Sequence, residues 1–378
     1  MKLAIVGGHL SPALAVIDAL PKGTQILFIG RKYAFEGDKT LSLEYRTITE
    51  HKIPFATIST GRWQRKFTRF TIPSLFKIPY GAVQSFLILR KFKPDVFLGF
   101  GGYLSLPLGL AAFILRIPIV IHEQTLEAGI ANRILSIFAK KVCVSWETSW
   151  AFFPSSKIVL TGNPIRKFKV SRGAGSRFAR QFSINDKNLR VIYITGGSSG
   201  SHFINTLVEG CIKKLLEKFI IIHQTGDAQT YHDFDRLKKL RESLPFELKE
   251  RYRLTKFVEP ENVGLVMQRA DLVVSRAGIN TVTELIFFKK PSFLIPLPSS
   301  QKNDQLKNAL FLKNLGLAEV FYQDMLDSKK LLRFIGEMIN NIDRYEILNQ
   351  VQNDKGNAAQ KIIEVIEYAK RPNKEQVR

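Results

Sequence analysis

The stretch KLAIVGGHLSPALAVIDAL at residues 2–20 joins a short apolar run to a glycine turn and then to an apolar segment of helical length. This order predicts a buried strand, a tight turn at Gly7 and Gly8, and a helix that begins near Ser11 and Pro12. The first N–H groups of a helix have no partner within the helix, and the helix dipole is positive at that end. Glycine has no side chain that would keep a phosphate away from the backbone. The stretch therefore predicts a strand–turn–helix unit that can bind an anion.

The same junction occurs three more times along the chain. Apolar runs at 95–100, 190–195 and 271–275 are each followed by a glycine-containing turn and then by a helix-like segment. Two junctions fall in each half, and strands that alternate with helices are typical of parallel α/β sheets. The sequence thus predicts an α/β fold with two doubly wound, Rossmann-like domains that face each other across a cleft. Ligands of such domains bind outside the carboxyl ends of the strands.

The domain boundary is expected near Arg166, because the stretch 170–187 is polar, basic and glycine-containing, as linkers are. We therefore expect one domain over 1–165 and a second over 166–355, which suits a chain of 378 residues. The last helix-like segment, within 356–378, is expected to pack back on the first domain.

Membrane spans, disulfides and metal sites are not predicted. The longest apolar region, 104–121, is interrupted by two prolines and an arginine, and predicts a helix followed by a buried strand. Residues 1–16 predict a first strand and not a signal peptide. Cys143 and Cys211 are too few for a disulfide framework, and neither they nor the six histidines have metal-ligand spacing. We expect a protein without a metal site in a reducing, cytoplasmic compartment.

The charge of the chain is strongly positive. Lys and Arg outnumber Asp and Glu by 56 to 33, which gives a formal net charge of +23. Such an excess favours anionic partners such as nucleic acid, phospholipid headgroups or phosphorylated substrates. Between residues 51 and 94, nine basic residues occur and no acidic one.

Within this region, the segment 61–78 alternates basic residues with aromatic and aliphatic ones. Its basic side chains would meet anionic lipid while the apolar ones enter the headgroup boundary. The residues expected at the membrane are Arg62, Trp63, Arg65, Lys66, Phe67, Arg69 and Phe70. Two alternatives remain open, namely a solvated loop followed by a core helix, and a nucleic-acid groove. No recognisable nucleic-acid module occurs, so we expect no nucleic acid among the partners.

The glycine turns do not match a dinucleotide-binding fingerprint. That motif needs G-x-G-x-x-G after the first strand and an acidic residue after the second, whereas this chain has Gly7-Gly8-His9 and Arg31 there. A P-loop sequence is absent as well. The turn GGSSG at 196–200 formally matches the G-x-S-x-G nucleophile elbow, but no HGGG-type segment precedes it. A phosphate-binding turn is the favoured interpretation, with a serine hydrolase as the alternative.

Eight motifs follow one another along the chain. They are GGHxxPAL at 7–14, GFGGYLSxP at 99–107, HEQ at 122–124, NR at 132–133, TGNPxR at 161–166, GGSxG with N at 196–205, RAGxxTVxE at 276–284, and PxP with QxxNA at 296–309. In this order they closely resemble the MurG family of N-acetylglucosaminyltransferases, from residue 1 to about residue 320. The resemblance implies a GT-B fold and an inverting transfer of N-acetylglucosamine from UDP-N-acetylglucosamine. The acceptor would be the C4 hydroxyl of the muramyl sugar of lipid I, giving lipid II for peptidoglycan synthesis.

Two positions depart from the family pattern. The family usually has the longer first loop G-G-T-G-G-H, whereas this chain has only Val6-Gly7-Gly8-His9. Thr125 stands where the family has an asparagine after His-Glu-Gln. The first difference shortens an acceptor-side loop, and the second removes an amide that the family places near the substrates.

The resemblance places the donor in the second domain. The donor-binding residues it implies are Arg166, Ser198, Val258, Ile279, Asn280, Thr281, Val282, Thr283, Glu284 and Gln305. Ser198 and the amides after Gly197 would contact the diphosphate, and with Arg166 they would stabilise the leaving UDP without an obligatory metal or cofactor. The Val258 backbone would contact uracil, Glu284 the ribose hydroxyls, and Gln305 the sugar. Thr281-x-x-Glu284 is also a capping box, so Glu284 has an alternative role in closing its helix.

The first domain would hold the acceptor and the membrane surface. The acceptor-binding residues implied are Gly7, Gly8, Gly101, Gly102, Tyr103 and Thr125. His9 is the candidate general base, because imidazole titrates near neutral pH, and Glu123 is its expected support. The alternatives are that His9 binds a phosphate or caps its turn, and that His122 and Glu123 buttress the loop.

The partners implied are UDP-N-acetylglucosamine, the undecaprenyl-diphosphate-linked muramyl peptide (lipid I) and an anionic membrane. The protein would be peripheral on the cytoplasmic face of the plasma membrane, and would serve cell wall biogenesis, cell shape and cell division. Three alternatives remain open: a UDP-N-acetylglucosamine 2-epimerase, a glycolipid synthase that uses diacylglycerol, and a non-catalytic lipid–sugar binding protein.

Overall fold

The structure is a computed structural model that describes residues 1–33, 41–59, 71–165, 189–197, 199–228, 230–259, 262–298, 300, 303–345 and 357–371, without the side chains of residues 43 and 71–78. The chain forms two compact units. Unit 1 comprises Met1–Lys167 together with Asp354–Arg378, and unit 2 comprises Phe168–Asn353.

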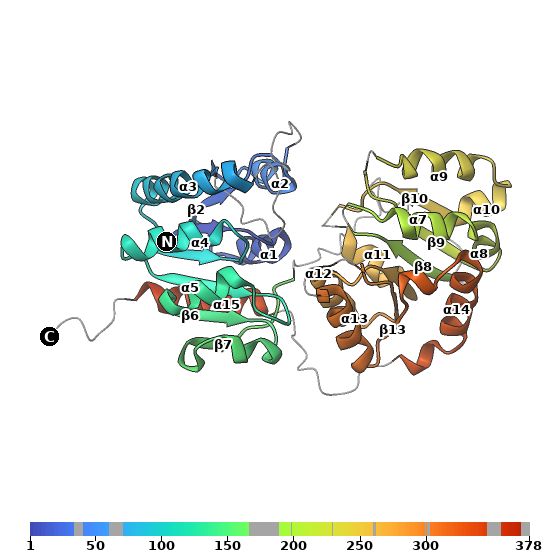
Figure 1. Cartoon of the computed structure of the whole chain (residues 1–378). Coiled ribbons are helices and arrows are strands. Elements are labelled where there is room, and N and C mark those ends of the chain that lie inside the picture. The colour runs from blue at the N-terminus through green and yellow to red at the C-terminus, as the bar shows by residue number, and fades with distance from the viewer. Residues whose placement is uncertain are drawn as a thin grey trace. The chain divides into compact units, whose positions relative to one another are not determined.

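Unit 1 is built on a seven-stranded parallel sheet with the strand order β3-β2-β1-β4-β5-β6-β7 (Figure 1). The strands are β1 Lys2–Val6, β2 Gln25–Gly30, β3 Phe55–Thr57, β4 Val96–Gly99, β5 Ile119–Glu123, β6 Lys141–Val144 and β7 Ile158–Leu160. Successive side chains of β1 point to opposite faces, so Leu3 and Ile5 join one buried cluster and Ala4 and Val6 join the other. Both faces of the strand are buried, which explains its continuously apolar sequence.

Helices cover both faces of this sheet. They are α1 Leu10–Ala19, α2 Leu43–Glu50, α3 Thr71–Phe92, α4 Ser105–Ile114, α5 Ile130–Phe138 and α15 Ala358–Lys370, with short 3₁₀ helices at Glu147–Phe152 and Ser155–Lys157. Helices α1 and α15 pack together and contribute to the cluster that contains Leu3 and Ile5. Helices α3, α4 and α5 contribute to the opposite cluster. The α15 helix, red in Figure 1, thus lies beside the blue and green elements of unit 1.

Unit 2 has a six-stranded parallel sheet with the order β10-β9-β8-β11-β12-β13. Its strands are β8 Arg190–Thr195, β9 Phe219–Gln224, β10 Tyr252–Thr255, β11 Leu272–Ser275, β12 Ser292–Leu294 and β13 Ala318–Val320. Its helices are α7 His202–Glu209, α8 Ile212–Lys218, α9 Asp233–Glu242, α10 Phe246–Arg251, α11 Val263–Arg269, α12 Ile279–Phe287, α13 Asp304–Asn314 and α14 Ser328–Asn340, with 3₁₀ helices at Gln323–Met325 and Ile342–Arg344. One buried cluster contains residues of α7, α8 and α14, and the other contains residues of α11, α12 and α13.

The four glycine-containing junctions follow β1, β4, β8 and β11. In each unit the strand order reverses between these two strands, at β1 and β4 in unit 1 and at β8 and β11 in unit 2. A doubly wound sheet binds ligands in the crevice at this reversal, outside the carboxyl ends of the strands. The prediction of two doubly wound domains is therefore confirmed, and the motifs lie where such domains bind ligands.

The apolar region 104–121 forms α4 and, after a short connection, the first part of the buried strand β5. The prediction of a helix followed by a buried strand is confirmed. Within the described part of the chain, no helix has both the length and the apolar character that a bilayer crossing requires.

Candidate functional site

The two glycine turns of unit 1 touch each other through their backbones. A Cβ atom on Gly8 would lie 2.5 Å from the Gly101 carbonyl group, and one on Gly102 would lie 2.8 Å from the Cα atom of Gly8. Gly101 and Gly102 also have φ angles of +72° and +79°, which favour glycine. A Cβ on Gly7 would meet the Phe28 ring at 2.7 Å. Glycine is therefore required here by packing, which brings the two junctions together at the carboxyl ends of β1 and β4.

His9 lies at the position that precedes α1, directly after these glycines. Its backbone is extended and its side chain makes no capping hydrogen bond, so the alternative that His9 caps the turn is not supported. Burial lowers the pKa of His9 below its usual value, and the charge of Glu123 opposes this shift only in part. The imidazole is thus neutral at neutral pH, the state that can accept a proton.

Glu123, at the end of β5, organises the loop that leads to α5. Its carboxylate accepts hydrogen bonds from the Thr125 N–H at 3.0 Å, the Gly129 N–H at 2.9 Å and the Asn132 side-chain amide at 3.0 Å. The side chain is buried, and its negative charge is satisfied by these donors. The Thr125 hydroxyl lies against the Glu123 carboxylate and the Glu127 carbonyl, and so is engaged inside the same loop.

His122 is buried one residue earlier on β5. Its Nε2 lies 3.1 Å from the Gly162 carbonyl oxygen and 3.3 Å from the Ser145 hydroxyl. Since a carbonyl can only accept, Nε2 carries the hydrogen. Burial lowers the pKa of His122 to about 4, so the ring is neutral and connects β5 to the segment after β7. These contacts favour the expected alternative in which His122 and Glu123 buttress the loop.

The sequence did not single out Arg31 as a site residue. The Arg31 guanidinium lies over the Tyr103 ring, 5.6 Å from its centroid, so the end of β2 joins the second glycine turn. A basic residue directly after a parallel strand was the signal that could have identified it.

The glycine turn of unit 2 is packed as tightly as those of unit 1. A Cβ atom on Gly196 would lie 2.2 Å from the Ser201 nitrogen, and one on Gly200 would lie 2.1 Å from the Thr225 carbonyl oxygen. Gly197 has open space around it, but its φ of +84° favours glycine. The turn therefore lies directly against the backbone that follows β9, and α7 begins after it with Ser201 as its cap.

Glu284 lies in the middle of α12 and not at its start. The helix begins at Ile279 with Gly278 at the capping position, so the capping-box interpretation of Thr281 and Glu284 is wrong. Among the described residues, no group donates a hydrogen bond to the Glu284 carboxyl group. Burial raises the pKa of Glu284 to about 7. Within the ranges that the structure describes, this half-buried acid lacks the donors that a carboxylate needs.

The other predicted residues of α12 differ in what they expose. Ile279, Val282 and Thr283 are buried, and the Thr283 hydroxyl donates to the Ile279 carbonyl within the helix. Asn280 and Thr281 are half-buried. Only these two and Glu284 therefore present accessible side chains in this segment.

Gln305, in the first turn of α13, accepts a hydrogen bond from the Leu297 N–H at 3.0 Å through its side-chain oxygen. Nearby, the Arg276 guanidinium donates to the Ile295 carbonyl, the Ser201 hydroxyl and the Gln323 side chain. Arg276 thus ties together the loops that follow β8, β11 and β12.

A buried glutamine that the sequence did not identify connects several of these elements. Gln224, the last residue of β9, contacts the Tyr193 hydroxyl, the Gly197 carbonyl and the Val258 N–H. The polar sequence His-Gln-Thr-Gly after an apolar run was the available signal, because it ends a strand beside a glycine.

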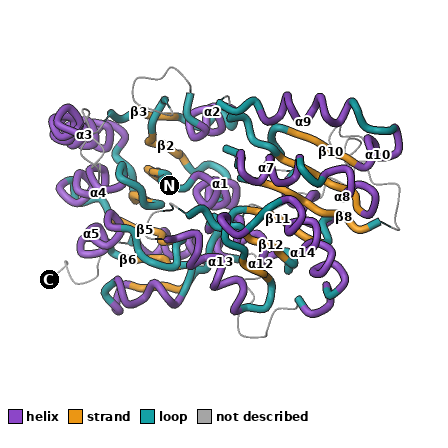
Figure 2. Tube along the Cα trace, turned by 45° about the vertical axis from the view of Figure 1, so that its right-hand side comes forward, coloured by secondary structure: helices purple, strands orange, loops and turns teal. Residues whose placement is uncertain are grey.

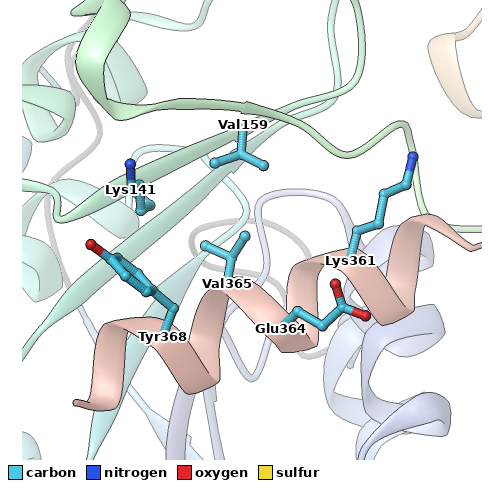
Figure 3. A pocket seen from close by; sticks show the side chains of 6 residues that line it. All are labelled: Lys141, Val159, Lys361, Glu364, Val365 and Tyr368. Carbon is cyan, nitrogen blue, oxygen red and sulfur yellow. The ribbon is translucent and has the colours of Figure 1, made fainter.

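Several predicted residues lie outside the described part of the chain. They are Arg62, Trp63, Arg65, Lys66, Phe67, Arg69, Phe70, Arg166 and Ser198. Among the described residues, no three His, Cys, Asp or Glu side chains are grouped to hold a metal ion. A pocket of about 420 Å³ between α15 and the strands β6 and β7 is lined by Lys141, Val159, Lys361, Glu364, Val365 and Tyr368 (Figure 3). None of the predicted site residues lines it.

Family models match both units of the chain. The N-terminal domain of glycosyltransferase family 28 matches residues 6–144, and the C-terminal domain of the same family matches residues 191–366.

Curated relatives cover nearly the whole chain. A Clostridium perfringens protein named UDP-N-acetylglucosamine–N-acetylmuramyl-(pentapeptide) pyrophosphoryl-undecaprenol N-acetylglucosamine transferase is 34% identical over 362 residues, 95% of this chain and 94% of the relative. A Treponema denticola protein of the same name is 33% identical over 341 residues, 88% of this chain and 85% of the relative.

Solved structures show the same fold. The Acinetobacter baumannii MurG structure has a TM-score of 0.67 at 26% identity, over 97% of this chain and 100% of that one. A Neisseria meningitidis UDP-GlcNAc 2-epimerase has a TM-score of 0.66 at 18% identity, over 97% and 100% of the two chains, and shares the fold alone. The fold, the family models and the curated relatives agree: the chain belongs to glycosyltransferase family 28 and, within it, to the MurG family of N-acetylglucosaminyltransferases.

Proposed function

We propose that this enzyme transfers N-acetylglucosamine from UDP-N-acetylglucosamine to the C4 hydroxyl of the muramyl sugar of lipid I, giving lipid II with inversion at the anomeric carbon. The observation that carries the proposal is the Glu284 carboxyl group, half-buried in the helix that follows the β11 junction and without a hydrogen-bond donor among the described residues. Two ribose hydroxyls would supply the missing donors, as a nucleotide sugar does.

The remaining donor contacts are proposed around this carboxylate in unit 2. The Val258 backbone would contact uracil, and Gln305 and the accessible start of α12 would contact the sugar. The diphosphate would lie against the glycine turn before α7, at the positive end of the helix dipole, where Ser198 and backbone amides would contact it. With Arg166, these groups would stabilise the charge that develops on UDP as it leaves.

The acceptor is proposed to bind in unit 1, against the glycine turns that meet at Gly8 and Gly102. In the reaction, the C4 oxygen of the acceptor forms a bond to the anomeric carbon, while the bond from that carbon to the UDP oxygen breaks. The proton of the C4 hydroxyl passes to His9, whose lowered pKa keeps the imidazole neutral. Glu123 supports this base by holding the loop after β5 in place.

An assay with radiolabelled UDP-N-acetylglucosamine and a lipid I analogue tests the proposal. Formation of a labelled lipid II analogue with release of UDP is the expected result. Conversion of the donor to its 2-epimer without the acceptor would replace the proposal by epimerase activity. Transfer of label to diacylglycerol would make the chain a different glycolipid synthase, and absence of any donor turnover would make it a binding protein.

The enzyme is also proposed to bind the cytoplasmic face of the plasma membrane through unit 1. Helices α3, α4 and α5 lie side by side in both views and contain no acidic residue (Figures 1 and 2). The large apolar residues that are more than half exposed on these helices are Tyr80, Val83, Leu87, Phe113, Ile114, Ile130 and Ile137. Arg90, Lys91, Arg116 and Arg133 lie on or next to the same helices. Exposed apolar groups with basic neighbours suit an anionic headgroup region, as the sequence of residues 61–78 does.

A further inference from the structure

The Gln224 side chain makes three hydrogen bonds, to strand β8, to the turn after β8 and to the loop after β10. Its Nε2 donates to the Gly197 carbonyl at 2.9 Å, in the turn after β8. Its Oε1 accepts from the Tyr193 hydroxyl at 2.9 Å and from the Val258 N–H at 3.2 Å, in the loop after β10. The side chain is 4% exposed. One buried amide therefore connects the β8 and β10 loops through the intervening strand β9.

The orientation of this amide follows from its partners. The Val258 N–H can only donate and the Gly197 carbonyl can only accept, so the Gln224 oxygen must face Val258 and its nitrogen must face Gly197. The Gly197 carbonyl also accepts from the Gly200 N–H at 3.1 Å, and the Gly197 N–H donates to the Thr195 hydroxyl at 3.0 Å. The glycine turn is thus held at both its carbonyl and its amide.

We propose that Gln224 is a positioning residue that sets the distance between the base subsite and the diphosphate subsite of the donor site. This inference rests on the proposed function, which places uracil at Val258 and the diphosphate at the turn that contains Gly197. Because peptide groups are planar, holding the Gly197 carbonyl also restricts the orientation of the peptide group that follows this residue. Gln224 touches neither reacting atom and acts through these two backbone segments.

The Glu284 carboxyl group, proposed to bind the ribose, is near enough to affect the Tyr193 hydroxyl of this network. Burial raises the pKa of the Tyr193 hydroxyl, and the nearby Glu284 charge raises it further, so this hydroxyl stays protonated and remains a donor to Gln224. The base and diphosphate subsites are therefore connected by a single neutral side chain. A neutral amide suits this place, because a carboxylate there would repel the Gly197 carbonyl.

Two substitutions test the inference, with UDP and uridine as separate probes in calorimetric titrations. Gln224→Glu keeps an acceptor for Val258 and Tyr193 but replaces the donor to Gly197, and Tyr193→Phe removes one hydrogen bond to Gln224. Uridine needs only the base and ribose subsites, whereas UDP must fit all three. We expect both variants to bind uridine within about twofold of wild type and to bind UDP roughly three- to thirtyfold more weakly.

Tyr252→Phe is the matched control for Tyr193→Phe. The Tyr252 hydroxyl is also buried and bonded to a residue of β9, His223 at 2.9 Å, but it makes no hydrogen bond to Gln224 or to the described residues of the glycine turn. Tyr193→Phe and Tyr252→Phe each lose a buried hydroxyl, so their melting temperatures should fall by comparable amounts. The ratio of UDP to uridine affinity should change only in Tyr193→Phe.

The outcomes separate the two proposals. Wild-type protein that binds neither UDP nor uridine would refute the proposed function itself. If the wild-type protein binds UDP, the positioning role can be tested separately. It would be refuted if Gln224→Glu and Tyr193→Phe kept the wild-type ratio of UDP to uridine affinity. Equal losses of UDP and uridine affinity in both variants would also refute it, since they would indicate a general structural effect.

Discussion

The Cα atom of Gly8 lies 2.8 Å from the position that a Cβ atom on Gly102 would occupy. Two loops separated by more than ninety residues thus pack backbone to backbone at the reversal point of the unit 1 sheet. No other residue type permits this approach, so the double glycines are needed for packing before any phosphate is bound.

Gly102→Ala should lower the melting temperature and the activity of the enzyme. The substitution adds the steric cost of the Gly8 contact, about 1–3 kcal/mol, to the cost of a left-handed backbone, about 1–2 kcal/mol. Gly23→Ala is the control, because Gly23 has a φ of +86° but nothing within 4 Å of its Cβ position. The difference between the melting temperatures of the two variants, measured by calorimetry, gives the cost of the contact with Gly8. Equal melting temperatures would mean that the turns separate easily.

Glu284→Gln should remove a pH dependence of UDP binding. The pKa of Glu284 is raised to about 7, so the acid is largely neutral at pH 6 and ionised at pH 8. Ribose hydroxyls donate better to the ionised form, so wild-type affinity for UDP should rise up to about tenfold over this range. Titrations at both pH values check this, and the variant should bind UDP weakly and equally at each. A wild-type affinity that does not vary with pH would contradict the assignment.

Glu284→Gln should also remove a pH dependence of stability. In the wild type, a rise in pH should strengthen UDP binding but lower the stability of the free protein. Because the folded pKa of Glu284 lies above the value for an unfolded chain, the acid stabilises the fold least once pH exceeds about 7. Without ligand, Glu284→Gln should therefore melt at a higher temperature than wild type at pH 8 and at a similar temperature at pH 4.5. A variant that is less stable at pH 8 would indicate a structural partner for the carboxylate.

His9→Ala should reduce kcat by about 10²–10⁴ while leaving UDP affinity unchanged, because the base acts on the acceptor side. The lowered pKa of His9 also predicts that the acidic limb of the wild-type kcat/KM profile lies below pH 6.5. Steady-state rates with a soluble acceptor measure both effects. Turnover close to that of wild type would remove His9 from the mechanism.

Membrane binding should separate into a salt-sensitive and a salt-resistant part. Replacing Arg62, Arg65, Lys66 and Arg69 by Gln should abolish sedimentation with anionic vesicles at moderate ionic strength, since each basic residue contributes about 1 kcal/mol. Replacing Phe113, Ile114 and Ile137 by Ser should weaken the binding that persists in high salt.

Both membrane variants should still glycosylate a short-chain, soluble acceptor. Phe246→Ser is the control, because Phe246 is 78% exposed but belongs to unit 2. Vesicle binding that matches wild type in the basic and apolar variants would identify these surfaces as ordinary solvated faces. Failure on the soluble acceptor would instead place the arginines in the active site.

The sequence by itself determined the fold, the positions of the four junctions and the family. Strand–glycine–helix units are local patterns, because the apolar run, the turn and the helix start are adjacent in the chain. Doubly wound sheets then bring all such turns to one edge, so the clustering of Gly7–Gly8 with Gly101–Gly102 follows from topology. The motif at 276–284 is local in the same way, which is why Glu284 could be proposed as a site residue without a structure.

Only the tertiary structure decided what these side chains touch. The sequence allowed Glu284 to close a helix, but α12 begins at Ile279, and no group in the described part of the chain donates a hydrogen bond to the desolvated carboxyl group. Glu123 and His122 were candidates for chemistry or for support, and their contacts to Asn132 and Gly162 come from other elements. Gln224, at the end of β9, joins the loops that follow β8 and β10. Hydrogen-bond partners and desolvation depend on groups distant in sequence, and such distances exist only once the sheet has formed.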